Sequence, residues 1–288
     1  MPDIQRTHAY HAEATVLHGD LHHPLVQEIK PQSNVKLAQR GGYLSEHAEP
    51  YRLEGVIAFD KAYTQVAGNK NDRKPEGGWN TLVTSVVEGL NILEVVTADR
   101  VIGQIATHHP EDGYVPRIHF LGTRFENLRI AGHPVKIHLH PGHPYHLSQP
   151  EDDGPYTRHS DFLDRVKSHF DRIRGSEGVP EGLLKRYNHL PETSGDEESI
   201  ECSLVTQVED LPFGRSFGNV IDIPDFGKIH LAVVKITHSD YGPAYYNKGK
   251  NVWKKTLVDL KMIDLDLGCS ATGTGTVGNT ITNGQNEP

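Results

Sequence analysis

The sequence predicts a mainly β protein, either an antiparallel β-sandwich or a barrel-like meander, with a small two-helix insert. Apolar runs between residues 81 and 140 are short, rich in β-branched side chains and interrupted by Gly and Pro, as in the strands of a buried sheet. Turn signals in this stretch recur about every 8–12 residues, which is typical of a meander or sandwich. The 28 Gly and 18 Pro among 288 residues fit a turn-rich fold, and we expect a single β domain over residues 1–288.

The N-terminal half supplies most of the expected strands. After an irregular start over residues 1–12, strands are expected at these apolar runs: Ala14–Leu17, Arg52–Phe59, Ala62–Ala67, several strands over 82–105, Arg117–Leu121, Phe125–Ile130 and Val135–His140. The polar stretch Gly68–Gly78 predicts a surface loop, and Thr107–Gly113 predicts a turn.

A helical insert is expected at about residues 158–190. Phe162, Val166, Phe170 and Ile173 recur at helical spacing, so they form one apolar face. A second short helix is expected over Glu181–Asn188, with Pro180 near its start. Because the outer face of this insert carries mixed charges, we expect it to cover one edge or end of the sheet.

Strands are expected to resume after an acidic, mobile loop over Pro191–Ser199. The runs that predict them are Ile200–Val208, Ser216–Ile223, Lys228–Thr237 and Thr256–Leu267. In the last run the apolar positions change parity at Met262 and Ile263, which predicts a bulge. Residues 268–288 are rich in Gly, Thr and Asn, and we expect a flexible tail there.

Composition excludes several classes of partner. The formal charge is −9 and the pI about 6.1, with no Lys/Arg stripe, so neither nucleic acid nor an anionic membrane is an expected partner. No apolar run approaches the ~18 residues of a membrane helix, and the start has no signal-peptide pattern, so a soluble, cytoplasmic protein is expected. Glu88, Asp99 and Arg100 stand among apolar strand residues and predict structural ion pairs.

Histidine and cysteine are the residues that could bind a metal. Among 19 His, His138 and His140 alternate on a predicted strand, so both imidazoles would project to one face and could chelate one ion, with His143 or His146 as a third ligand. The alternative is a solvated strand face that binds nothing. Cys202 and Cys269 are expected as free buried thiols, although a disulfide stays open if their strands are neighbours.

Three stretches resemble the secreted bacterial β domains called choice-of-anchor P. They are Val95–Val101, Leu121–Val135 and Leu265–Cys269 at the exit of the last strand. This resemblance implies a β scaffold with no known chemistry. The chain departs from those domains because it shows no signal peptide or anchor and carries the helical insert.

A second, looser resemblance is to the metal motif of cupins. Its first half, G-x5-H-x-H, is matched by Gly132, His138 and His140, and its second half, with one extra residue, by Gly218, Pro224, Gly227 and His230. The resemblance implies a divalent transition metal held by His138, His140 and His230. Pro144 and Tyr145 stand where the motif would place its Glu.

Two functions follow as hypotheses. The first is a soluble, non-catalytic structural or binding protein, of unknown small-molecule ligand and with no cofactor, that assembles into a homo-oligomer through exposed strand edges. The alternative is a metal-dependent, cupin-like enzyme centred on His138, His140 and His230. The many histidines also predict that assembly or binding depends on pH.

Overall fold

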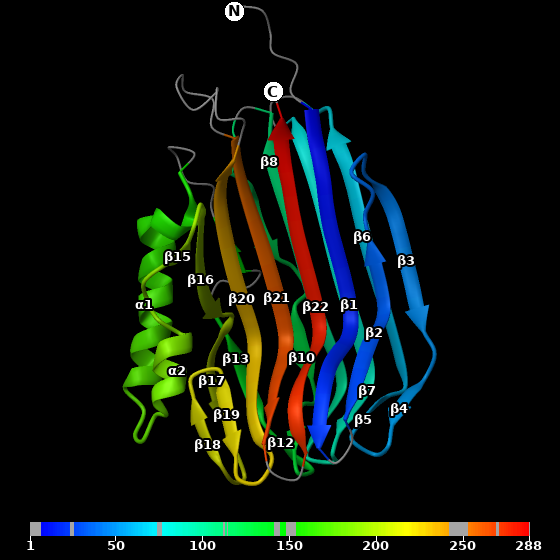
Figure 1. Cartoon of the computed structure of the whole chain (residues 1–288), viewed down its shortest axis with the longest axis vertical. Helices are drawn as coiled ribbons and strands as arrows, with labels where there is room; N and C mark the ends of the chain where they lie inside the picture. The colour runs from blue at the N-terminus through cyan, green and yellow to red at the C-terminus, as the bar shows by residue number, and fades with distance from the viewer. Residues whose placement is uncertain are drawn as a thin grey trace, which may run out of the picture.

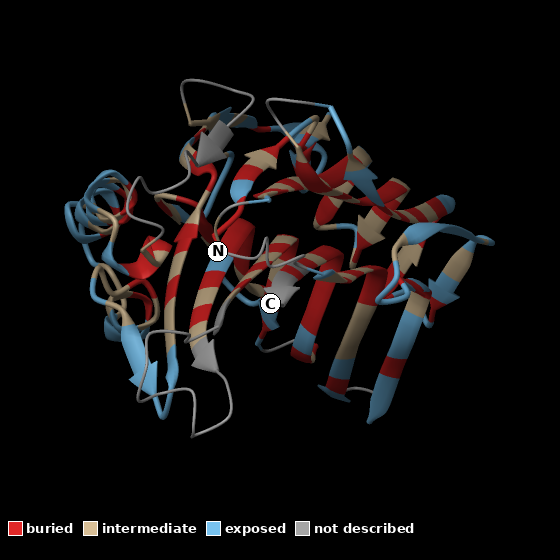
Figure 2. Cartoon of the chain, turned by 90° about the horizontal axis from the view of Figure 1, so that it is seen from above, coloured by how far each residue is buried: buried red, intermediate tan, exposed pale blue. Residues whose placement is uncertain are grey.

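The computed structural model of the chain describes residues 7–23, 26–73, 77–111, 113, 115–140, 145–147, 154–241, 253–268 and 271–287. Within these ranges, only the backbone is described for residues 145–147, 240–241, 253–254, 283 and 285–287. Two large antiparallel sheets face each other and bury their facing sides (Figures 1 and 2). The predicted sandwich with a small helical insert is therefore confirmed.

Sheet A, which faces the viewer in Figure 1, has the order β15-β16-β20-β21-β22-β1-β2, with the hairpin β18–β19 joined to β20. Its strands are β1 (Thr7–His23), β2 (Gln27–Lys36), β15 (Glu192–Ser194), β16 (Glu197–Ser203), β18 (Arg215–Phe217), β19 (Val220–Ile223), β20 (Gly227–Tyr241), β21 (Trp253–Leu267) and β22 (Thr272–Glu287). Both ends of the chain thus meet in this sheet, because β1 pairs with β22 along its whole length.

Sheet B lies behind and is centred on the long β7–β8 pair. Its strands are β3 (Gly42–Ala48), β4 (Tyr51–Leu53), β5 (Ile57–Phe59), β6 (Lys61–Asn71), β7 (Gly78–Ile92), β8 (Val96–Pro110), β9 (Arg117–Phe120), β10 (Arg124–Glu126), β11 (Arg129–Ile130), β12 (His133–Pro134) and β14 (Tyr145–Leu147). A separate two-stranded sheet pairs β13 (Lys136–Leu139) with β17 (Val205–Glu209).

The insert lies on one flank of the sandwich, beside β16 and the β18–β19 hairpin (Figure 1). It consists of the short 3-10 helix η1 (Tyr156–Arg158), α1 (Ser160–Arg174) and α2 (Glu181–Arg186). Helix α1 buries Phe162, Val166, His169 and Ile173. Phe170, which the spacing predicted on this face, is only half-buried, and His169 takes its place in the contact with the sheet.

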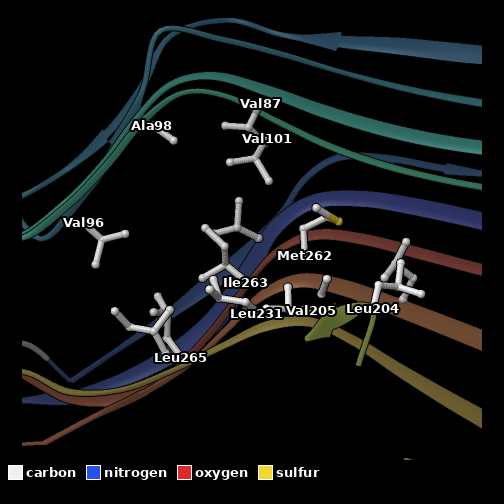
Figure 3. Close-up of a cluster of buried hydrophobic side chains, with 14 of the residues drawn as sticks. Val87, Val96, Ala98, Val101, Leu204, Val205, Leu231, Met262, Ile263 and Leu265 are labelled. Atoms are coloured by element: carbon white, nitrogen blue, oxygen red, sulfur yellow. The ribbon is translucent and has the colours of Figure 1, made fainter. Parts of the chain in front are cut away.

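The core between the sheets is apolar. In each sheet, the strands change once along their length which alternate side chains face this core. In β21, the buried apolar residues are Val258, Leu260 and Met262, then Ile263, Leu265 and Leu267. Met262 and Ile263 both point toward sheet B, where Val87 and Val101 face them (Figure 3). The predicted bulge is wrong, although the predicted change of face is present. The change of face needs no extra residue, because the register of β21 with β20 and β22 continues unchanged across it.

The neighbouring strands of sheet A change pleat at the same level. Register places Ala232 of β20 and Gly278 of β22 on either side of Met262, and Val16 and Ser33 continue the row across β1 and β2. Ala232, Gly278 and Ser33 have positive φ values of 43°, 68° and 43°. Alternate strands thus use a left-handed residue, which is costly for a residue with a Cβ. At this row, the positions whose side chains face the core change from one parity to the other in these neighbouring strands.

Sheet B makes the equivalent change at Gly89 of β7, whose φ is 66°. Asn127 continues this row with a φ of 52°, and its side-chain amide donates to Asp99 Oδ2 at 3.0 Å. Next to this row, Arg100 forms an ion pair with Glu88 across the β7–β8 pair. The predicted ion pair of Glu88 and Arg100 is confirmed, whereas Asp99 accepts from an amide.

The predicted flexible tail over residues 268–288 is wrong. Residues 272–287 form β22, a central strand between β21 and β1. Several of its buried positions are small, such as Gly275 and Thr280. A Cβ on Gly278 would lie 3.1 Å from Cβ of Met262, so this position requires glycine for space as well as for φ.

Three smaller expectations are also corrected. The start is regular from Thr7, where β1 pairs with β22. The predicted turn at Thr107–Gly113 begins later, because β8 continues to Pro110 opposite Gly78. The acidic stretch predicted as a mobile loop forms the β15–β16 hairpin, which extends sheet A beyond β20.

Candidate functional site

Two of the predicted metal ligands, His138 and His230, contact other side chains in the structure. His138 lies on the exposed side of β13, and its Nε2 is 3.0 Å from Oε2 of Glu209 on β17. The register shift after His138 leaves Thr206 of β17 as the extra residue, and β13 ends at Leu139, one residue before His140. The backbone N–H of His140 donates to the carbonyl of Leu204 at 2.9 Å. His143 and the side chain of His146 lie outside the described residues.

His230, the third predicted ligand, lies on β20 beneath the helical insert and is 2% exposed. Its Nδ1 is 2.8 Å from the hydroxyl of Tyr187. Across the parts of the chain that are described, no group of three or more His, Cys, Asp or Glu is arranged to hold a metal ion. The cupin-like metal site stays a prediction. In the structure, the His138 imidazole contacts Glu209 and the His230 imidazole contacts Tyr187.

Of the two cysteines, Cys202 is a free thiol buried in the core, and Cys269 lies outside the described residues. Burial raises the pKa of the Cys202 thiol to about 12, so the thiol stays protonated and unreactive at neutral pH. The expected free buried thiol is confirmed for Cys202.

A chain of buried polar side chains joins the insert to the outer face of sheet A. Asn219 Nδ2 donates to the carbonyl of Leu231 at 3.3 Å and to the hydroxyl of Tyr187 at 3.1 Å. The Leu231 carbonyl can only accept, so it fixes the orientation of the amide. Tyr187 therefore donates its proton to Nδ1 of His230. On the other side, Asn219 Oδ1 accepts from Nε2 of His169 at 2.9 Å.

Both imidazoles of this chain are held neutral. Burial lowers the pKa of His169 to about 4; the bond to Asn219 opposes this shift, and Arg172 adds to it. Burial, followed by the nearby Arg186, lowers the pKa of His230 to about 3. Burial also raises the pKa of the Tyr187 hydroxyl, so this group remains protonated. These hydrogen-bonded side chains are thus uncharged at neutral pH, as their burial requires.

Arg186 extends the same junction with charge. Its Nε donates to Glu201 Oε1 and its Nη2 to Asp264 Oδ2, both at 2.6 Å. Thr276 donates to the other oxygen of Asp264 at 3.1 Å. The last residue of α2 is thereby bonded to β16 and β21 at once. A hollow of about 130 Å³ beside this bridge is small for a ligand pocket, which typically holds ~300 Å³ or more.

The buried contacts of this junction hold the insert against the sheet and are not arranged for catalysis. Tyr187 and His230 form a donor–acceptor pair suited to proton transfer, but they are 1% and 2% exposed and a substrate does not reach them. Tyr187, Asn219 and His169 were not identified from the sequence, because they lie far apart along the chain. The only signal was periodicity: His169 stands three residues after Val166 and four before Ile173, which is helix-face spacing.

The opposite flank of the sandwich is uncovered. Strand β3 pairs only with β6 and forms the edge of sheet B far from the helices (Figure 1). Leu44 of β3 lies directly opposite Val66, a fully buried core residue, so the two side chains share the inward face. Leu44 is nevertheless 46% exposed, and the adjacent Tyr43 is 62% exposed. This flank therefore leaves an inward-facing apolar side chain in solvent.

No helix in the described part of the chain is long and apolar enough to span a membrane. No curated protein and no solved structure matches the sequence. A family model does match over residues 8–237, which span β1 to most of β20 and include the helical insert. The chain belongs to this family, which is described as a domain of unknown function, DUF8256.

Proposed function

We propose that this protein is a non-catalytic scaffold or binding protein that assembles with a second copy of itself through strand β3. The observation that carries the proposal is Leu44, an inward-facing core position that is 46% exposed at the free edge of sheet B. A second copy of β3, paired antiparallel, would cover this side chain and pair with backbone groups of the edge other than the Glu46 carbonyl, which Ser33 already bonds. The resemblance to choice-of-anchor P domains, which stays a prediction, implies the same kind of scaffold role.

The two strands of this flank differ in how well they resist pairing. Strand β2, the edge of sheet A, carries Lys30, Pro31 and Lys36, which are charged or cannot donate a backbone hydrogen bond. Strand β3 has the sequence GYLSEHA, with neither Pro nor Lys and with Glu46 as its one carboxylate. Edge strands that are not meant to pair usually carry such protection, so β3 is the better candidate for contact.

A two-fold axis at Leu44 gives a self-complementary contact. It would pair Leu44 with its own copy and place Glu46 opposite Gly42, so the two carboxylates stay apart. A strand of seven residues buries less than the ~1,200 Å² of a standard interface, so we expect a weak, concentration-dependent dimer. The net charge of −9 on each copy predicts that added salt strengthens the association.

Sedimentation velocity over a concentration series tests the proposal. We expect the wild-type protein to shift toward a dimer as concentration rises, and Leu44→Lys to remain monomeric, because it buries an unpaired charge at the contact. Val26→Lys is the matched control, since Val26 is 89% exposed in the connection between β1 and β2, outside β3, and should dimerise like wild type. A wild-type protein that stays monomeric at all concentrations and salt levels would contradict the proposal, as would a Leu44→Lys variant that still dimerises.

A further inference from the structure

A groove crosses the outer face of sheet A over β1, β2 and β22, away from both the insert and the β3 edge. Its volume is about 330 Å³, within the ~300–1,000 Å³ range of ligand pockets. The polar side chains around it include His18, Asp20, Glu28, Asn34 and Asn279. Three different strands thus contribute polar groups to one hollow, which a merely solvated sheet face does not require.

Asn279 is the residue that most clearly indicates a ligand. It is 7% exposed, and its amide makes no hydrogen bond to any described residue. The amide opens into the groove, where water can bond it, so a bound ligand would take the place of that water. A ligand in the groove that both donates and accepts would supply the missing partners.

Asn34 on β2 offers a second amide to the same space. Its Oδ1 accepts from Thr15 Oγ1 at 3.2 Å, which fixes the orientation of the amide and leaves its NH₂ group free to donate. His18 on β1 adds an imidazole whose pKa is lowered, chiefly by burial and then by Lys261, which favours the neutral ring. The groove therefore presents uncharged donors and acceptors together.

The lining of the groove disfavours anionic ligands. None of its lining residues is Lys or Arg. Glu13 is paired with Lys36 at 3.5 Å, which leaves Asp20 and Glu28 as acceptors at the other end. Phosphates and carboxylates would be repelled there, whereas hydroxyl groups can donate to both carboxylates. The half-buried Ile281 supplies apolar surface that can pack against the C–H face of a sugar ring.

The geometry points to a binding site for a neutral saccharide in this groove, with Asn279 and Asn34 bonding adjacent ring hydroxyls and Asp20 or Glu28 accepting from others. This site is independent of the β3 edge, because none of its lining residues lies on β3. Its ligand would bind weakly, since the groove is shallow and lacks an aromatic platform.

Isothermal titration calorimetry with cellotetraose, mannotetraose and xylotetraose tests the inference, with the chain intact and EDTA present to remove divalent cations. We expect saturable binding of at least one of the three. Asn279→Leu keeps the side-chain size but removes both hydrogen-bonding groups, so affinity should fall at least tenfold, about 1.4 kcal/mol. Asn34→Ala, at an exposed position that the fold tolerates, should also weaken binding.

The matched control is Asn69→Ala, an exposed amide on β6 of the other sheet, which should bind as wild type does. Leu44→Lys should also leave binding unchanged, which separates this site from the proposed assembly. If no neutral tetrasaccharide binds saturably, or if both groove variants bind as well as wild type, the inference is wrong. Binding of anionic polygalacturonate in preference to all three neutral probes would overturn it as well.

Discussion

The two flanks of the sandwich differ in whether the edges of the sheets are covered. On one flank, η1, α1 and α2 lie against β16 and the β18–β19 hairpin, and a buried hydrogen-bond chain holds them there. On the other, β2 and β3 end their sheets with no covering element (Figure 1). The difference teaches that sheet edges are not equally protected within one fold, and that the open flank is where a partner has room to dock.

The covered flank is held in place by buried polar side chains, and because two of these are histidines its stability depends on pH. Its polar chain satisfies nearly every buried group through the orientation of Asn219. The exception is Nδ1 of His169, which is buried and has no hydrogen-bond partner among the described residues. The open flank has few buried ionisable groups to lose. Acid and point mutations should therefore separate the two flanks.

The largest expected effect is a loss of stability in acid. The folded pKa values of His169 and His230, about 4 and about 3, lie below the unfolded value near 6.5, so the unfolded state binds more protons below pH ~6.5. Asp259 acts in the opposite direction, because burial raises its pKa to about 6 and the folded state gains one proton. For these three groups alone the net difference is one proton, which predicts a loss of about 1.4 kcal/mol per pH unit between pH ~6 and ~4.

Urea unfolding at a series of pH values measures this slope. Asp259→Asn removes the opposing proton, so the slope should steepen by about 1.4 kcal/mol per pH unit. Asp266→Asn, an exposed aspartate near the end of the same strand, is the control and should leave the slope as it is. His109, fully buried between the sheets with a pKa lowered chiefly by burial, adds to the loss in the same direction. Stability that is constant from pH 6.5 to 4 would show that these imidazoles are not held neutral.

The next largest effect is expected for Asn219→Ala. Asn219 is fully buried and bonds His169, Tyr187 and the Leu231 carbonyl, so its removal leaves three polar groups unpaired. We expect a loss of about 3 kcal/mol in the free energy of unfolding. Asn69→Ala, at an exposed site, should change it by less than about 0.5 kcal/mol. Equal effects of the two substitutions would mean that the buried chain does not fasten the insert.

A smaller effect is expected for Arg186→Met, which keeps the length of the side chain but removes its charge. Glu201 and Asp264 would then face each other's charge at the junction without their shared cation. Because the three side chains retain 14–29% exposure, solvent screens part of the cost, and we expect about 2 kcal/mol. Proteolysis should cut first within the insert of this variant. Lys185→Met, whose ion pair with Glu181 is solvent-exposed, is the neighbouring control.

Sequence patterns predicted the scaffold better than the site. The sandwich, the two-helix insert and the change of face at Met262 all follow from local periodicity, which burial enforces directly. Strand β22 did not, because its many Gly and Asn residues have weak strand propensity. It is a strand because β1 and β21 pair with it along both edges, and tertiary context of this kind overrides propensity.

The helix face and the polar junction show why the rest was hidden. Hydrophobicity favoured Phe170 over His169, but only His169 meets Asn219 beneath α1. That partnership joins residues 50 apart in sequence, so no local pattern contains it. His230 was identified from a motif resemblance, whereas its observed partner is Tyr187. Buried polar contacts between distant segments require the fold before they can be inferred.

The smallest effect is expected on the open flank, with Ser33→Ala. The Ser33 hydroxyl donates to the Glu46 carbonyl at 3.0 Å and lies 2.9 Å from the Thr64 hydroxyl, so it ties β3 to β2. Its loss should cost about 1 kcal/mol, and amide hydrogens of β3 should exchange faster while those of α1 do not change. Ser45→Ala, on the exposed side of β3, is the matched control and should leave exchange unaltered. If Ser33→Ala instead loosened the helical flank, the two flanks would be one cooperative unit and the contrast between them would fail.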